Sequence, residues 1–93
     1  MEEQFIAAWM AARKNAAAIG VRFRPMAEDM ALQTAYRCLN GHRESDGFGI
    51  LADKHQLQWS LEALVIDKRF TGLFTDEQAN TALQRLLNAG YRF

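Results

Sequence analysis

The 93-residue sequence is poor in several features that mark specialised classes of protein. It contains one cysteine and one proline, and its eleven basic residues balance eleven acidic ones. A single cysteine excludes an internal disulfide framework, a zinc site made only of cysteines and a CxxC redox motif. A net charge of zero argues against a dedicated nucleic-acid-binding domain, because such domains are usually basic overall.

Long apolar runs and a positively charged start are also missing. The first charged residues are Glu2 and Glu3, whereas a secretory signal opens with positive charge. No stretch reaches the roughly eighteen uncharged apolar residues that a membrane-spanning helix needs. We therefore expect a soluble, cytoplasmic protein without membrane association, and the free thiol of Cys38 fits a reducing compartment.

The composition that is present is that of an ordinary folded domain. Apolar residues make up 49% of the chain and charged residues 24%, which is not the composition of a disordered segment. A chain of this length has room for one hydrophobic core, and folding would hide about two-thirds of its surface. We therefore expect residues 1–93 to form a single helical domain.

Periodic apolar residues predict an all-α fold. In the first helix, Phe5, Trp9, Ala12, Ala16 and Ile19 recur at spacings of three and four, which places them on one face. The last helix begins with a capping box, in which Thr75 is the cap and a glutamine follows three residues later. Glycines end both patterns. The prediction is a compact four-helix domain with helices at 2–19, 26–40, 54–69 and 75–89.

The segments between these helices are less regular. Residues 20–25 alternate apolar and basic side chains, so we expect a short extended connector with Val21 and Phe23 pointing inward. Residues 50–66 fit both a helix and a β-hairpin built from residues 48–66. Because no glycine or proline interrupts residues 50–71, length favours the helix.

The polar residues do not assemble a convincing catalytic or metal-binding motif. Cys38 and His42 lie four residues apart, with Asp46 and His55 downstream, but this spacing does not match the paired ligands of a zinc site. Cys38 lies beside an apolar helical stripe, where thiols are usually inert. The paired carboxylates all fall in first turns of helices, where the helix dipole explains them. We therefore predict no enzyme activity, no catalytic or metal-binding residues and no small-molecule cofactor.

A basic stretch is the main argument for a nucleic-acid partner. No acidic residue occurs between Gln4 and Ala27, and arginines there are interleaved with Phe23. Arginines and aromatic rings together can bind phosphates and stack on bases. The candidate residues for a nucleic-acid-associated regulator are Arg13, Lys14, Arg22, Arg24, Arg37 and Arg43.

Surplus apolar side chains favour a protein partner instead. In a helix over 54–69, Trp59 points away from the stripe formed by Leu57, Leu61 and Leu64. A helix that is apolar on two faces is either central in the fold or meets a partner. We predict a small accessory protein that binds another protein, as an inhibitor, adaptor or regulator, or that forms a homodimer. The interface candidates are Trp59, Ile66, Phe70, Tyr91 and Phe93.

Overall fold

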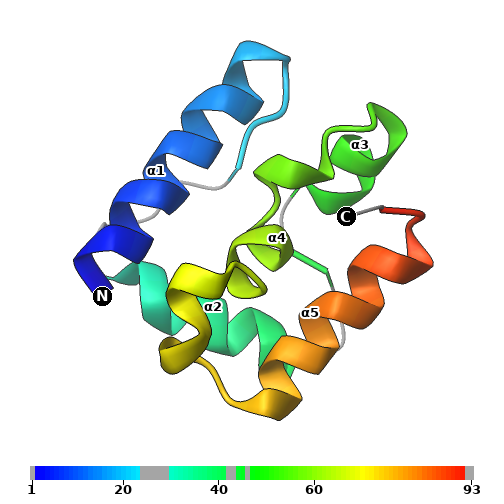
Figure 1. Ribbon diagram of the computed structural model, residues 1–93. Helices are drawn as coiled ribbons and strands as arrows, with labels where there is room; N and C mark the ends of the chain where they lie inside the picture. Colours follow the sequence, from blue (N-terminus) through cyan, green and yellow to red (C-terminus); the bar gives the residue numbers. More distant parts are fainter. Residues whose placement is uncertain (1, 24–29, 42–43, 46, 92–93) are drawn as a thin grey trace.

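The computed structural model describes residues 2–23, 30–41, 44–45 and 47–91. All the regular secondary structure in these residues is helical, so the all-α fold is confirmed. The hairpin alternative for 48–66 is wrong, because that stretch contains no strand. The helices, which include the two 3₁₀ helices η2 and η3, are α1 (Glu2–Ala18), α2 (Ala31–Asn40), α3 (Phe48–Asp53), η2 (Leu57–Trp59), α4 (Leu61–Val65), η3 (Lys68–Leu73) and α5 (Asp76–Asn88) (Figure 1).

The first helix matches its sequence pattern closely. Of the five apolar residues that the periodicity places on one face, Phe5, Trp9, Ala12 and Ala16 are buried in α1. Ile19 lies just after the end of the helix and is 36% exposed. Gly20 follows the helix with a φ of 87°, a left-handed conformation that suits glycine. The amide of Val21 donates to the carbonyl of Ala16, and that of Gly20 donates to Ala17. These two bonds form a Schellman motif, which satisfies carbonyls that the end of the helix would leave free.

The segment after α1 is partly described. Val21 is fully buried and Phe23 is half-buried, so both point inward as expected. The α2 helix begins at Ala31, and residues 24–29 of the predicted connector and helix lie outside the described residues. Along α2, the buried stripe consists of Ala31, Ala35 and Leu39.

The long helix predicted over 54–69 is wrong. The structure breaks this segment into η2, α4 and the start of η3, and it adds the unpredicted α3 upstream. Ser60 ends η2 and caps α4, because its hydroxyl donates to the carbonyl of Leu57 and accepts from the amide of Ala63. Asp67 caps η3 by accepting from the amide of Arg69. Serine and aspartate side chains compete with the helical hydrogen bonds of the backbone, and here they redirect the chain twice.

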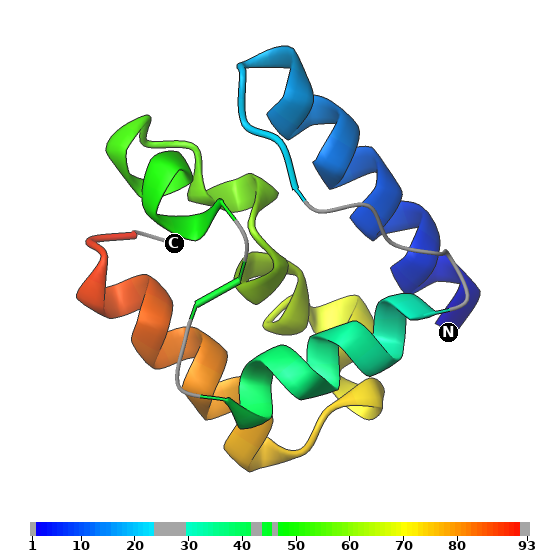
Figure 2. The ribbon, with the colours of Figure 1, turned by 180° about the vertical axis from the view of Figure 1, so that it is seen from behind.

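The short α4 helix occupies the centre of the fold. It packs against α1, α5, η2 and η3, and Figures 1 and 2 show it surrounded from both sides. Leu61, Leu64 and Val65 are buried in one apolar cluster with α1, α2 and α5. A second cluster around Phe48 and Leu51 joins α3 to the ends of α1 and α5. The presence of apolar residues on more than one side of this segment is therefore explained by its central position.

The last helix has the predicted start and end. The hydroxyl of Thr75 accepts from the amide of Gln78, while the Gln78 side chain accepts from the amide of Thr75. Phe74, one residue before the cap, is buried. A second Schellman motif at Gly90 ends α5, with the amide of Tyr91 donating to Leu86. No helix in the described ranges is long and apolar enough to cross a membrane.

Candidate functional site

An apolar groove runs between α5 and the segment that joins α4 to η3. Val65 and Phe74 are buried and form its floor. Ile66 on one side and Ala79 and Leu83 on the other are partly exposed and form its walls. The groove has a volume of about 400 Å³, and α4 and α5 lie side by side in Figures 1 and 2. Its size and its apolar lining suit the insertion of side chains from another molecule.

The groove floor is held by aromatic packing. The ring of Phe74 makes T-shaped contacts with the rings of Phe5 and Tyr36, with ring centroids 5.5 and 5.6 Å away. The hydroxyl of Tyr36 donates to the carbonyl of Leu73 at 2.6 Å, which fixes the residue before Phe74. Together with the capping box at Thr75, these contacts join the groove floor to α1 and α2 and fix the start of α5.

The rim of the groove is polar and carries negative charge. Thr71, Thr75, Asp76 and Asn80 are exposed around it. Of the described residues that line the groove, Asp76 alone is charged. An apolar floor inside a polar rim is the usual arrangement of a protein interface.

The apolar wall of α5 continues beyond the groove. Leu87 lies one turn after Leu83 on the same helical face and is 48% exposed. The sequence predicts a buried stripe of Ala79, Ala82, Leu83, Leu86 and Leu87 in this helix. Of these five residues, only Ala82 and Leu86 are buried in the structure. The apolar stripe of α5 is therefore wider than the part of the helix surface that the core covers. Nothing in the sequence distinguishes the two buried residues from the three others, because all five fit the same periodicity.

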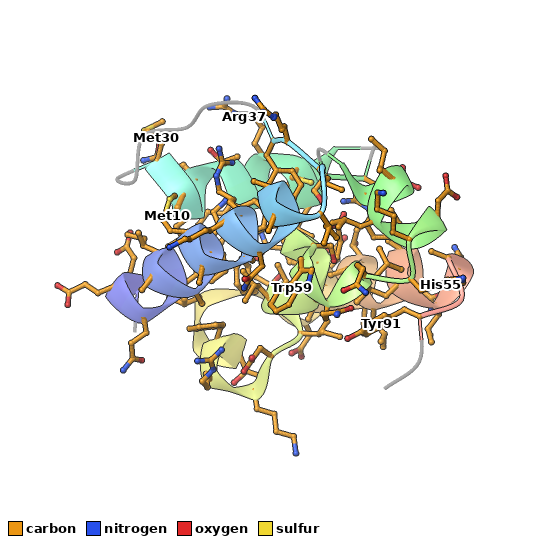
Figure 3. The ribbon with its side chains drawn as sticks, turned by 90° about the horizontal axis from the view of Figure 1, so that it is seen from above. Met10, Met30, Arg37, His55, Trp59 and Tyr91 are labelled. Carbon is orange, nitrogen blue, oxygen red and sulfur yellow. The ribbon has the colours of Figure 1, made fainter. Side chains whose placement is uncertain are left out.

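The predicted interface residues are only partly brought together. Ile66 lines the groove, whereas Trp59 lies between α1 and the C-terminal segment that carries Tyr91 (Figure 3). Trp59 is half-buried, packs against both apolar clusters, and its indole N–H donates to the Gln56 side chain at 3.2 Å. Tyr91 is half-buried against the second cluster. Phe93 lies outside the described residues.

Phe70 is not available as an interface residue. Its side chain is fully buried, and its ring lies edge-on to Phe5 with centroids 5.3 Å apart. The guanidinium of Arg69 covers it at 4.9 Å from the ring centroid. Phe70 therefore belongs to the core, because the turn at Asp67 directs η3 back against α1 rather than outward.

The predicted basic surface is also divided. Arg13 lies over the stacked rings of Trp9 and Phe23, with centroid distances of 5.9 and 5.6 Å, so it is part of the packing of α1. Lys14, Arg22 and Arg37 are exposed, and Arg37 points outward from α2 in Figure 3. Arg24 and Arg43 lie outside the described residues.

The most concentrated polar chemistry lies inside the molecule. The buried carboxylate of Glu62 accepts from the amide and hydroxyl of Ser45 and from the guanidinium of Arg85 at 3.3 Å. The other Arg85 nitrogen donates to the carbonyls of Cys38 and Gly41 at the end of α2. The Cys38 sulfur accepts from Arg85 at 3.4 Å. These contacts join α2, α4 and α5. The sequence analysis missed this role because the residues involved are far apart in the chain.

The metal-site candidates remain apart or undescribed. Within the described ranges, no three histidine, cysteine, aspartate or glutamate side chains lie close enough together to hold a metal ion. His42 and Asp46 lie outside those ranges, and His55 is exposed on the turn after α3 (Figure 3). His55 adopts a φ of 58° because it ends α3 with the hydrogen bonds of a Schellman motif.

One surface ion pair shifts the titration of its members. Two hydrogen bonds from the Arg69 side chain, and a further one from its amide, hold the pKa of Asp67 below its ordinary value. The same carboxylate raises the pKa of Arg69. Asp67 is the N-cap of η3, and Arg69 adds an ion pair to this cap. Neither residue lines the groove.

Comparison of the chain with protein families, with curated proteins and with solved structures gives no match.

Proposed function

We propose that this chain is a small non-enzymatic accessory protein that binds another protein through the groove between α5 and the α4–η3 segment. The observation that carries the proposal is the groove itself, with its buried floor of Val65 and Phe74 and its partly exposed apolar walls. Amphipathic helices commonly bind in such grooves by inserting apolar side chains at helical spacing. A role as an inhibitor, adaptor or regulator fits this mode of binding.

The polar groups of the fold support a binding role rather than catalysis. Glu62 is fully buried and paired, so its carboxylate has no access to a substrate. Ser45 directs its hydroxyl to that carboxylate, and the Cys38 sulfur faces Arg85. A catalytic base or nucleophile must reach the reacting atoms of a substrate, whereas Ser45 and Glu62 are turned toward each other and the Cys38 sulfur contacts Arg85.

Substitutions that block the groove without removing core contacts test the proposal. Ala79→Gln adds a long side chain on the groove wall and keeps a good helix former. Ile50→Gln is the matched control, because Ile50 is 53% exposed on α3 and outside the groove. Circular dichroism and melting temperature should show that both variants fold like the wild type.

The tagged proteins are then compared in pull-downs from the cells that make the chain, with bound proteins identified by mass spectrometry. The expected result is a partner retained by the wild type and by Ile50→Gln and lost by Ala79→Gln. Light scattering reports whether the retained partner is a second copy of the chain. A partner captured equally by all three proteins would place binding elsewhere and contradict the proposal.

The exposed cations of α1 and α2 support a second candidate, a nucleic-acid-associated regulator. Lys14, Arg22 and Arg37 are exposed, and they form no ion pair with another described residue. Phosphate-driven binding weakens steeply with added salt, whereas insertion of apolar side chains hardly responds. Titration of a labelled oligonucleotide at low and moderate salt, with wild type and Arg22→Gln, separates this candidate from the groove.

A further inference from the structure

The charges around the groove are unevenly distributed along α5. Asp76 and Glu77 are exposed in its first turn, and its one cation, Arg85, is 11% exposed and bound to Glu62. The outward surface of α5 therefore presents two carboxylates without a free compensating cation. On the opposite side of the groove, Arg69 is paired with Asp67, and Lys68 remains as an exposed cation outside the groove lining.

A second, polar depression adjoins the groove across the ridge of α5. Its lining includes the exposed residues Glu77, Gln84 and Asn88, together with the paired Arg85. Asn80 lines both depressions, so the apolar groove and the polar depression meet at this residue. One face of the molecule thus offers an apolar channel beside a polar shelf that carries a carboxylate.

We infer that the partner segment is a basic amphipathic helix, which inserts its apolar face into the groove and lays its lysine or arginine side chains along Asp76, Glu77 and the polar shelf. This inference rests on the proposed function and adds the chemistry of the partner to it. The apolar channel selects a helix with a continuous apolar stripe. Neither carboxylate forms an ion pair with another described residue. The two carboxylates therefore select cations and disfavour acidic segments, because complementary charge sets specificity and association rate.

Length gives a further constraint on this partner. The α5 helix has 13 residues, which corresponds to about 20 Å. A helix of about four turns lying along α5 spans this distance and places three or four apolar side chains over Ile66, Leu83 and the exposed Leu87. A shorter segment would cover the groove lining between Asp76 and Leu83 without reaching Leu87.

Synthetic peptides test the inference directly. One peptide of about four turns has a leucine stripe and a lysine-rich polar face, a second replaces the lysines by glutamates, and a third scrambles the lysine peptide to destroy the stripe. Binding to the full chain is measured by fluorescence anisotropy. The lysine peptide should bind at least about tenfold more tightly than either of the other two, and Ala79→Gln should reduce its affinity about tenfold.

Charge variants of the protein give the matched control. Asp76→Asn with Glu77→Gln should weaken the lysine peptide about three- to tenfold, and the loss should shrink as salt is added. Lys68→Gln changes the charge in the opposite sense and should leave that affinity unchanged or raise it. Circular dichroism verifies that each variant stays folded, since Asp76 and Glu77 also stabilise the start of α5.

The other outcomes overturn the inference and separate it from the proposed function. If the glutamate peptide binds as tightly as the lysine peptide, charge does not select the partner. If the scrambled peptide binds as tightly, the apolar stripe does not select it. Failure of every peptide, while Ala79→Gln still loses a partner from cells, removes the basic helix but keeps the groove. A homodimer that Ala79→Gln dissociates assigns the groove to a second copy. Failure of both the peptides and the groove variant removes both proposals.

Discussion

The carboxylate of Glu62 and the guanidinium of Arg85 lie 3.3 Å apart inside the molecule, and the Glu62 side chain is fully buried. The same guanidinium holds the carbonyls of Cys38 and Gly41, so one side chain joins three helices. A buried pair of this kind contributes less through its net attraction than through the cost of leaving one member unpaired. The pair therefore ties together α2, α4 and α5, of which α4 and α5 contribute residues to the groove.

Removal of Arg85 is expected to destabilise the fold strongly. Arg85→Ala leaves a buried carboxylate without its cation and removes a donor from the carbonyls of Cys38 and Gly41, which should cost about 3–5 kcal/mol of unfolding free energy. Urea denaturation followed by circular dichroism measures this loss. Arg69→Ala, which breaks an exposed pair, is the control and should shift the midpoint little. Similar losses for the two variants would show that the Glu62–Arg85 pair is not buried as described.

Alanine substitutions at Gly47 and Gly49, two residues apart, should change the stability of the fold in opposite directions. Gly47 has a φ of 76°, and a Cβ there would lie 2.7 Å from the Phe23 ring and 2.9 Å from Val21. Gly49 lies in α3 with open space around it. Gly47→Ala should cost about 2 kcal/mol or more from strain and overlap, whereas Gly49→Ala should gain up to about 1 kcal/mol. Thermal unfolding of both variants decides, and a neutral Gly47→Ala would contradict the close approach of residues 21–23.

The two tryptophans should differ in their contribution to stability. Trp9 is 4% exposed and stacks on Phe23, so Trp9→Ala should cost about 3–5 kcal/mol. Trp59 is half-buried, and Trp59→Ala should cost roughly 2 kcal/mol, since part of its ring already contacts solvent. Urea titrations compare them. If Trp59→Ala also leaves partner capture unchanged, Trp59 serves the fold and not the interface.

The ion pair of Asp67 and Arg69 should make the cap of η3 dependent on pH. The folded pKa of Asp67 is lowered, so its stabilising effect is present above the ordinary value near 3.8 and is lost as the pH falls below it. Arg69→Gln removes the hydrogen bonds that lower this pKa, and the Asp67 carboxyl should then titrate at higher pH. NMR titration of the side-chain carboxyl resonance measures the change. An unchanged titration would mean that Arg69 does not hold Asp67 in solution.

The helix ends and helical faces could be predicted because their signals are local. Thr75 and Gln78 form the expected capping box, and Gly20 and Gly90 take the left-handed conformations that end α1 and α5. Such features depend on hydrogen bonds within a few residues, so the sequence pattern contains everything that determines them. The all-α class follows from the same local preferences.

The break in the helix predicted over residues 54–69 depends on both local hydrogen bonds and tertiary packing. Ser60 and Asp67 can cap a new helix, but a serine or an aspartate is also tolerated within a helix that faces solvent. Packing of Leu61, Leu64 and Val65 on all sides decides in favour of the break, because a short central helix buries these residues against four neighbouring elements. The apolar surplus that suggested an external partner is largely used inside the fold in this way.

Apart from Ile66, which the sequence already offered as an interface residue, the candidate site was decided by tertiary structure. Ala79, Leu83 and Leu87 share the periodicity of the buried Ala82 and Leu86, and only the width of the contact with α4 determines which of them stay exposed. Glu62, Arg85 and the end of α2 meet across long stretches of sequence, and no local pattern records that meeting. Sequence periodicity states which face of each helix is apolar, whereas the path of the connecting segments determines how much of that face its neighbours cover.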